Sequence, residues 1–220
     1  MKMDTEIVQK TLDILDDAVQ SYEVPVVDLI KVQTDDPFRI LVATILSART
    51  KDSTTAKVSE NLFQKIRNLE DIENIEEEDL ALLLKPVGFY REKARSIKRL
   101  PGVIRNDFGG KIPEEVEDLI RLPGVGRKTA NLVSAVAFNR DAICVDTHVH
   151  RIMNRFGYIS TETPLESEMA LRETLPVDYW KKVNRILVAF GQNKCTPISP
   201  HCSSCPVNSL CEQKGVRSSR

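Results

Sequence analysis

The chain has 220 residues, of which 41% are hydrophobic, so it is long enough to bury a core in one or two compact domains. Its formal net charge of -1 argues against indiscriminate binding to nucleic acids, although a net charge averages over faces that can differ greatly. Because the N-terminus is charged and amphipathic, we expect neither a secretory leader nor a membrane span, and we expect a prokaryotic cytoplasmic protein.

Helical periodicity dominates the chain and predicts an all-α protein. Asp36 followed by Pro37 is typical of a helix start. The residues that follow form an apolar face at helical spacing: Phe38, Leu41, Val42, Ile45 and Leu46. Asp52 is then expected to cap a second helix, from Ser53 to about Ile66.

Two neighbouring stretches carry opposite charge. Residues 70–79 hold seven acidic side chains and no basic one, whereas residues 85–105 hold seven basic side chains against Glu92 alone. The acidic run is most simply a solvated face. The basic run, which begins at an expected connecting turn, is either a second solvated face or a surface that contacts phosphates.

Residues 122–130, with the sequence LPGVGRKTA, predict a tight turn followed by a helix. Pro123 fixes one turn position, while Gly124 and Gly126 permit backbone angles and close approaches that a Cβ forbids. The segment from Arg127 to about Phe138 is rich in Ala, Leu and Val and lacks proline, which favours a helix. The N–H groups at the start of such a helix attract a phosphate. A simple helix-connecting turn is the alternative.

Lys128 falls in the first turn of this predicted helix, where a cation is usually unfavourable. An ordinary lysine, with a pKa of about 10.4, is neutral in only roughly one molecule in 2,500 at pH 7. A nucleophilic lysine therefore needs a lowered pKa, and a positive helix end acts in that direction. A solvated lysine that binds phosphate is the alternative.

Asp146 precedes another predicted helix. Apolar residues recur there at helical spacing, and a glycine supplies the stop: Val149, Ile152, Met153, Phe156 and Gly157. Asp146 or Thr147 is expected to cap this helix. Capping is compatible with catalysis, because a carboxylate held ionised by N–H donors can accept a proton from an amine or stabilise a nearby oxocarbenium-like charge.

Four cysteines near the C-terminus, Cys195, Cys202, Cys205 and Cys211, follow the spacing C-x6-C-x2-C-x5-C. Zinc, an iron-sulfur cluster and two disulfides are the candidates, and the expected compartment disfavours disulfides. The spacing matches neither the common paired zinc pattern nor the ferredoxin patterns, so it leaves the metal open. Cys144 lies in a separate apolar run and is expected to be a buried small residue.

Together and in this order, these motifs resemble the endonuclease III family of DNA glycosylases, within the helix-hairpin-helix superfamily. The match runs from about Asp36 to Cys211 and includes the segment Leu46–Asp52. The resemblance implies that the hairpin holds a DNA phosphate, that Lys128 is the nucleophile and that Asp146 is its essential partner. It also implies that the four cysteines carry a 4Fe-4S cluster.

The implied reaction is bifunctional. A damaged base is flipped out of duplex DNA, Lys128 attacks the sugar C1′, and Asp146 accepts the amine proton. The resulting Schiff base allows β-elimination, which breaks the strand 3′ to the abasic site. Related adenine-excising enzymes lack this lysine and related thymine-mismatch enzymes carry a tyrosine there, so oxidised pyrimidines are the expected substrates.

Several residues are expected to contact the damaged double-stranded DNA: Arg49, Phe89, Leu122, Gly124, Val125, Gly126, Arg127 and His148. By resemblance, Arg49 fills the gap left by the flipped base and Phe89 wedges a base step. The family often has glutamine and leucine at these two positions, so this chain departs from the pattern at both. His148 is expected near Asp146.

The resemblance also implies two helical lobes that bind DNA between them. One lobe is expected to span residues 25–138, and the other to combine residues 1–24 with residues 139–220 and the cluster loop. We expect a monomer. Two other functions fit the motifs: a monofunctional mismatch glycosylase, and a noncatalytic iron-sulfur protein that binds DNA, against which the combination of Lys128 and Asp146 argues.

Overall fold

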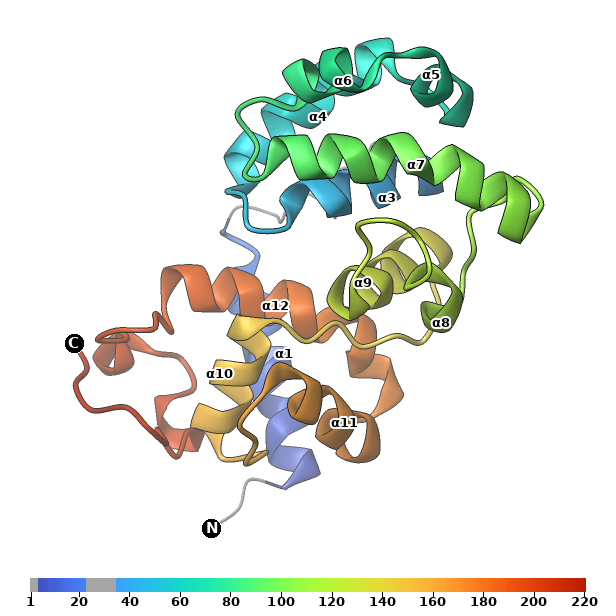
Figure 1. Cartoon of the computed structure of the whole chain (residues 1–220). Helices are drawn as coiled ribbons and strands as arrows, with labels where there is room; N and C mark the ends of the chain where they lie inside the picture. The colour runs from blue at the N-terminus through green and yellow to red at the C-terminus, as the bar shows by residue number, and fades with distance from the viewer. Residues whose placement is uncertain (1–3, 23–34) are drawn as a thin grey trace. The chain divides into compact units, whose positions relative to one another are not determined.

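The computed structural model describes residues 4–22 and 35–220 (Figure 1). Throughout these ranges the chain forms helices and loops without a β-strand, so the all-α prediction is confirmed. None of the helices in these ranges is long and apolar enough to cross a membrane. The predicted lobe boundary between residues 24 and 25 falls outside the described ranges.

Backbone contacts divide the chain into two compact units. We call residues 26–142 the hairpin unit, and residues 1–25 with residues 143–220 the cysteine unit. Each unit has its own core of buried apolar side chains. Each is described by itself below.

The described part of the hairpin unit contains α3 (Pro37–Ser47), α4 (Asp52–Lys65), α5 (Leu69–Asn74), α6 (Glu77–Leu84), α7 (Tyr90–Phe108), α8 (Val116–Leu119) and α9 (Arg127–Phe138). α3 is buried at Phe38 and from Ile40 to Leu46, which is more than the one apolar face that the sequence predicted. It packs against α4, α7 and α9, and α7 lies along α5 and α6 (Figure 1). α3 is therefore the centre of this unit.

The start of α3 agrees with the sequence, whereas the start of α4 does not. Asp36 is the N-cap of α3, and its carboxylate accepts a hydrogen bond from the Phe38 N–H at 2.9 Å. Asp52, in contrast, is the first residue of α4, and Lys51 occupies the N-cap position without a side-chain cap. The prediction that Asp52 caps a helix from Ser53 is therefore wrong, because the backbone of Asp52 is already helical and its carboxylate lies in the first turn.

The described part of the cysteine unit contains α1 (Thr5–Val19), α10 (Thr147–Phe156), α11 (Pro164–Thr174), α12 (Trp180–Asn193) and the short 3-10 helices η1 (Val177–Tyr179), η2 (Cys202–Ser204) and η3 (Asn208–Leu210). α12 packs against both α1 and α10. The apolar stripe predicted for α10 is buried, and α10 ends at Gly157, whose φ is 82°. The carboxylate predicted to cap α10 thus begins a helix that is anchored in the core.

Candidate active site

In the hairpin unit, α8 and α9 are joined by the tight turn that the glycines predicted. The Val125 N–H donates to the Leu122 carbonyl at 3.1 Å, and the Ala130 N–H donates to the Gly126 carbonyl at 2.9 Å. α9 spans Arg127–Phe138, which confirms the predicted helix. Its N-cap, Gly126, provides no side chain to cap the first N–H groups. The start of α9 therefore has the helix dipole and backbone donors that favour an anion.

The two glycines of the turn have different roles. Gly124 has a φ of 78°, and a Cβ on it would lie 2.9 Å from the Ser96 Cβ, so the fold requires glycine there. Gly126 has a φ of -93°, which any residue adopts, and a Cβ on it would meet no atom of the chain within 4 Å. The expectation that Gly126 permits a special backbone angle is therefore wrong. The fold leaves open space beside the first turn of α9 at this residue.

The other hairpin residues divide into a buried and an accessible set. The side chains of Leu122 and Val125 are buried in the core of the hairpin unit, so only their backbone atoms are placed to contact a ligand. Lys128 is exposed in the first turn of α9. Arg127 precedes it, half-buried, with its Nη1 4.0 Å from the Glu117 Oε1. The hairpin thus exposes Lys128 and the backbone at Gly126, while the buried side chains of Leu122 and Val125 anchor it in the core.

Arg49 and Phe89, which are distant in sequence, form a contact within the hairpin unit. The Arg49 Cζ lies 4.5 Å from the centre of the Phe89 ring, within the range of a cation-π interaction. Phe89 is 54% exposed and Arg49 is also exposed. Both residues have a φ of 56°, a left-handed conformation that is uncommon without glycine.

Lys93 was not identified as a site residue by the sequence. It is only 8% exposed, and its Nζ donates to the carbonyls of Leu46 at 2.7 Å and Ala48 at 2.6 Å. Burial lowers the pKa of Lys93 to about 8. The sequence does contain a signal of this burial, because Lys93 lies at helical spacing from Ile97 on the apolar face of α7. The basic run of residues 85–105 is therefore not uniformly solvated.

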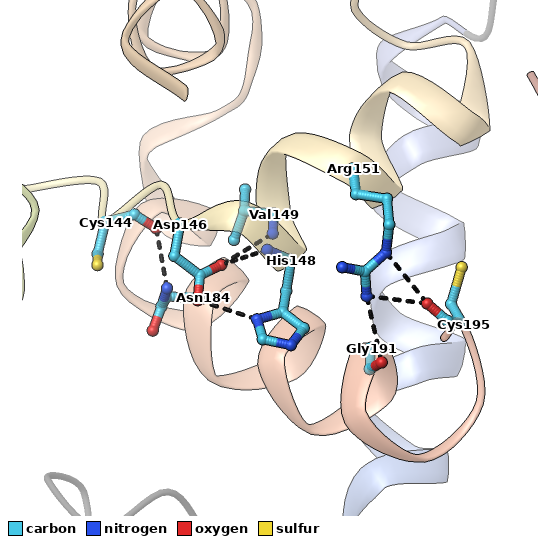
Figure 2. A network of polar contacts seen from close by, with 8 residues as sticks. All are labelled: Cys144, Asp146, His148, Val149, Arg151, Asn184, Gly191 and Cys195. Atoms are coloured by element: carbon cyan, nitrogen blue, oxygen red, sulfur yellow. Dashed lines mark hydrogen bonds and ion pairs between the residues drawn. The ribbon is translucent and has the colours of Figure 1, made fainter. Parts of the chain in front are cut away.

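In the cysteine unit, Asp146 is the N-cap of α10, as the sequence predicted. Its Oδ1 accepts hydrogen bonds from the N–H groups of His148 at 2.8 Å and Val149 at 3.0 Å. The His148 Nδ1 lies 3.1 Å from its Oδ2, and the carboxylate is 8% exposed (Figure 2). These donors stabilise a negative charge at a position fixed by the backbone. His148 contacts Asp146, as expected.

The sequence did not predict the close packing of α12 behind this carboxylate. A Cβ on Gly191 would lie 2.7 Å from the His148 Cδ2, so only glycine allows α12 to approach α10 there. The Arg151 Nη2 donates to the carbonyls of Gly191 at 3.2 Å and Cys195 at 2.9 Å (Figure 2). The Asn184 side chain donates to the Cys144 carbonyl at 3.1 Å. α12 therefore holds the segment before Asp146, and Arg151 of α10 ties the end of α12 to the residue that begins the cysteine loop.

The four cysteines of residues 195–211 line one cavity. The Arg155 Nη1 lies 3.2 Å from the Cys195 Sγ, and the Gln213 N–H donates to the Cys211 Sγ at 3.4 Å. Burial raises the pKa of the Cys211 thiol to about 11. Cys144 is buried outside the cavity, as the sequence predicted.

The four thiols provide the donor set of a metal centre. Among residues 4–22 and 35–220, no group of three or more His, Cys, Asp or Glu side chains is close enough to hold a single metal ion. A zinc ion would draw its sulfur ligands to about 2.3 Å, whereas an iron-sulfur cluster is bound by thiolates that surround a larger group. Four thiols around one cavity provide the four sulfur ligands that an iron-sulfur cluster uses.

Lys128 and Asp146 belong to different units, the first to the hairpin unit and the second to the cysteine unit. Within the hairpin unit, the structure brings Arg49 and Phe89 together. Within the cysteine unit, it brings Asp146 and His148 together.

Two family models match the chain. Residues 42–177 match the HhH-GPD superfamily of base excision DNA repair proteins, and residues 195–211 match the iron-sulfur binding domain of endonuclease III. The second match covers all four cysteines of the loop. The prediction of a 4Fe-4S cofactor is thereby confirmed.

Named relatives and solved structures agree with these two family matches. Endonuclease III of Thermotoga maritima is 45% identical over 177 residues, which cover 80% of this chain and 83% of the relative. A trapped covalent intermediate of endonuclease III with DNA superposes with a TM-score of 0.83 at 33% identity, covering 95% of this chain and 96% of that one. A thermostable thymine-DNA glycosylase superposes with a TM-score of 0.81 at 27% identity, covering 94% and 96%. The chain belongs to the endonuclease III family.

Proposed function

We propose that this chain is a bifunctional DNA glycosylase and AP lyase of base excision repair that removes oxidised pyrimidines from duplex DNA. The observation that carries the proposal is Lys128 in the first turn of α9, directly after the helix-hairpin-helix turn, in a member of the endonuclease III family. An amine at this place supplies both the nucleophile and the Schiff base that a lyase needs. The trapped covalent complex of endonuclease III with DNA supports the same chemistry.

In the proposed reaction, the damaged nucleotide leaves the base stack and enters a pocket of the enzyme. The neutral amine of Lys128 attacks C1′, the bond from C1′ to the base breaks, and the base leaves with the electron pair. Asp146 accepts the proton that the amine loses. Its position at the N-cap of α10, with donors from the His148 and Val149 N–H groups, supports this role because these bonds hold the carboxylate in one orientation.

The lyase step follows from the same adduct. Ring opening turns the amine adduct into an iminium, which acidifies the protons on C2′. Loss of one of these protons expels the 3′ phosphate as the C3′–O bond breaks, and hydrolysis then frees Lys128. Strand cleavage 3′ to the abasic site therefore needs no second nucleophile.

We propose that the backbone at Gly124 and Gly126 holds a DNA phosphate at the start of α9, with Arg127 beside it and His148 as a further contact. We expect Gly126→Ser to weaken binding to a damaged duplex about tenfold, because its Cβ would occupy the open space beside the helix start. The unfolding free energy should stay within about 0.5 kcal/mol of wild type, because serine is a good N-cap. Fluorescence anisotropy of the duplex and thermal unfolding measure the two effects.

Gly124→Ala provides a contrast in stability. It should lower the unfolding free energy by about 2 kcal/mol, because its φ of 78° and the Ser96 contact both disfavour a side chain. Unchanged DNA binding in a folded Gly126→Ser protein would contradict the assignment of the phosphate site.

The chain carries a 4Fe-4S cluster, and we propose Cys195, Cys202, Cys205 and Cys211 as its ligands. When bound, the cluster cross-links the loop of residues 195–211 through metal-thiolate bonds. Freshly purified wild type should be brown, and Cys205→Ser should lose most of its iron and visible absorbance. Cys144→Ser is the control and should keep both, because Cys144 lies outside the cavity. Full iron content in Cys205→Ser would refute this ligand set.

The function is tested with a panel of damaged duplexes incubated with and without borohydride. We expect base release from oxidised pyrimidines, strand cleavage before alkali treatment, and a borohydride-trapped protein-DNA adduct. A monofunctional mismatch glycosylase is the second candidate, because the thymine-DNA glycosylase has nearly the same fold as this chain. That function would release thymine from a mismatch and cleave the strand only after alkali, without an adduct.

We further propose a monomer with lobes of residues 25–138 and of residues 1–24 with 139–220, acting on chromosomal DNA in a prokaryotic cytoplasm. The separate apolar cores of the hairpin and cysteine units support two lobes. The similarity to the enzyme of Thermotoga maritima supports a prokaryotic setting.

A further inference from the structure

Arg155 of α10 lines the cavity of the four cysteines and is 8% exposed. Its guanidinium donates to the carbonyls of Thr196 and Pro197 at 2.8 Å each, and its Nη1 lies 3.2 Å from the Cys195 Sγ. A buried cation is unfavourable unless a counter-charge or hydrogen bonds replace its hydration. Within residues 4–22 and 35–220, the acceptors of this guanidinium are carbonyl oxygens and one sulfur, and no carboxylate bonds to it. The cavity therefore holds a buried positive charge without an acidic partner.

A second arginine reaches the same cysteine. Arg151 lies one helical turn before Arg155, and its Nε and Nη2 donate to the Cys195 carbonyl at 3.3 and 2.9 Å (Figure 2). Two cations four residues apart on a helix repel each other. Their convergence on Cys195 fits an anionic occupant of the cavity, and an iron-sulfur cluster bound by four thiolates is such an occupant.

The backbone of Arg155 contacts the other end of the cysteine loop. Its carbonyl accepts a hydrogen bond from the Lys214 N–H at 3.0 Å, and the Cys211 Sγ lies 3.5 Å from the same oxygen. The side chain of Arg155 thus bonds to the segment that begins with Cys195, while its backbone bonds to the segment that follows Cys211. Because α10 is anchored in the core of the cysteine unit, one residue fixes both ends of the loop against that core.

Arginine is suited to both of these contacts. Its guanidinium is planar and always charged, and its donors form a fork that reaches several acceptors at once. Hydrogen bonds from a cation to an anionic acceptor are stronger than those between neutral groups. Such bonds to the ligand sulfurs of an iron-sulfur cluster also change its reduction potential. A cation beside the sulfur favours the reduced state, which carries one more negative charge, and so raises the potential.

We propose that Arg155 is a positioning residue for the cluster, which holds Cys195 and Cys211 in place and donates a charge-assisted hydrogen bond to the Cys195 thiolate. The inference rests on the four cysteine ligands of the proposed function. Residues that orient metal ligands from outside the ligand set typically contribute 10–100-fold to metal affinity. Arg155 should therefore affect both how firmly the protein retains its iron and the potential of the cluster.

The experiment compares wild type with Arg155→Met, Arg155→Lys and Arg185→Met, each purified with its cluster. Arg185→Met is the matched control. Arg185 lies on α12 of the same unit and its Nη2 donates to the Asp16 Oδ1 at 2.5 Å, but it does not line the cavity. The rate of iron loss to a chelator, followed by visible absorbance, measures retention. Voltammetry of the iron-loaded protein gives the one-electron midpoint potential, which a loss of general stability does not change.

We expect Arg155→Met to lose iron about tenfold faster than wild type. Its reduction equilibrium should shift about tenfold toward the oxidised state, which lowers the potential by ~59 mV for one electron. Arg155→Lys keeps the charge but not the fork, so it should lose iron at least about threefold faster. Arg185→Met should keep the iron and the potential of wild type, even where its melting temperature falls as far.

An unchanged potential in iron-loaded Arg155→Met would overturn the hydrogen bond to Cys195, and unchanged iron loss would overturn the hold on the loop. If Arg155→Met purifies without iron, Arg155→Lys decides, and iron loss at the wild-type rate in that variant would overturn the inference. Equal changes in Arg185→Met would assign them to general stability and overturn it too. Neither measurement depends on base release, so a wild type that releases no damaged base would overturn the proposed reaction alone.

Discussion

Lys128→Gln is expected to abolish the borohydride-trapped adduct and to reduce strand cleavage at least about 10³-fold, because the amide cannot form a Schiff base. Lys128 is exposed in the first turn of α9, so the substitution should leave the fold intact. Binding to a damaged duplex should stay within about threefold of wild type, since one phosphate contact at most is lost. Trapping on denaturing gels, cleavage before alkali and anisotropy measure these three quantities.

Lys65→Gln is the matched control, an exposed lysine in the last turn of α4 in the same unit. It should retain full trapping. An adduct that persists in Lys128→Gln would show that another amine is the nucleophile. Base release without cleavage in wild type would instead point to the monofunctional mismatch reaction.

Asp146→Asn is expected to lower the rate of base release at least about 100-fold while changing the unfolding free energy by less than about 1 kcal/mol. Asparagine is as good an N-cap as aspartate, so the bonds from the His148 and Val149 N–H groups can be kept. The neutral amide, however, cannot accept the proton from Lys128 or stabilise positive charge on the sugar. Single-turnover base release and thermal unfolding separate the two roles of this residue.

Asp36→Asn provides the control for capping, because Asp36 is likewise an N-cap and accepts a hydrogen bond from the Phe38 N–H at 2.9 Å. It should have the same small effect on stability and little effect on base release. A loss of stability in Asp146→Asn with activity retained would make Asp146 a cap and nothing more.

The local features of the site were predictable from the sequence because each depends on residues a few positions apart. The start of α9 follows from a glycine turn ahead of an Ala- and Leu-rich segment, and the cap of α10 from a carboxylate ahead of an apolar stripe. Asp52 shows the limit of such reasoning. Helix boundaries expected from the sequence shift by a residue or two, and here the backbone of Asp52 is already helical.

Contacts between distant segments were not predictable in this way. No residue near Gly124 in the sequence indicates that Ser96 will exclude a Cβ at position 124. Likewise, no residue near Gly126 indicates that the space around position 126 is open. In the sequence, Lys93 is one charge in a basic run. Its burial follows from the packing of α7 on α3. The requirement for glycine at position 191 likewise arises only because α12 packs against α10 at His148.

By itself, the sequence determined the all-α class, the hairpin lysine, the capping aspartate and the four-cysteine loop, because periodicity, turn chemistry and ligand spacing are local. Only the tertiary structure decided that Leu122 and Val125 face the core, that the four thiols line one cavity, that Lys93 is buried against the end of α3, and that Arg49 stacks on Phe89. Burial and hydrogen-bond partners depend on which helices meet, and helix packing joins residues that no sequence window contains.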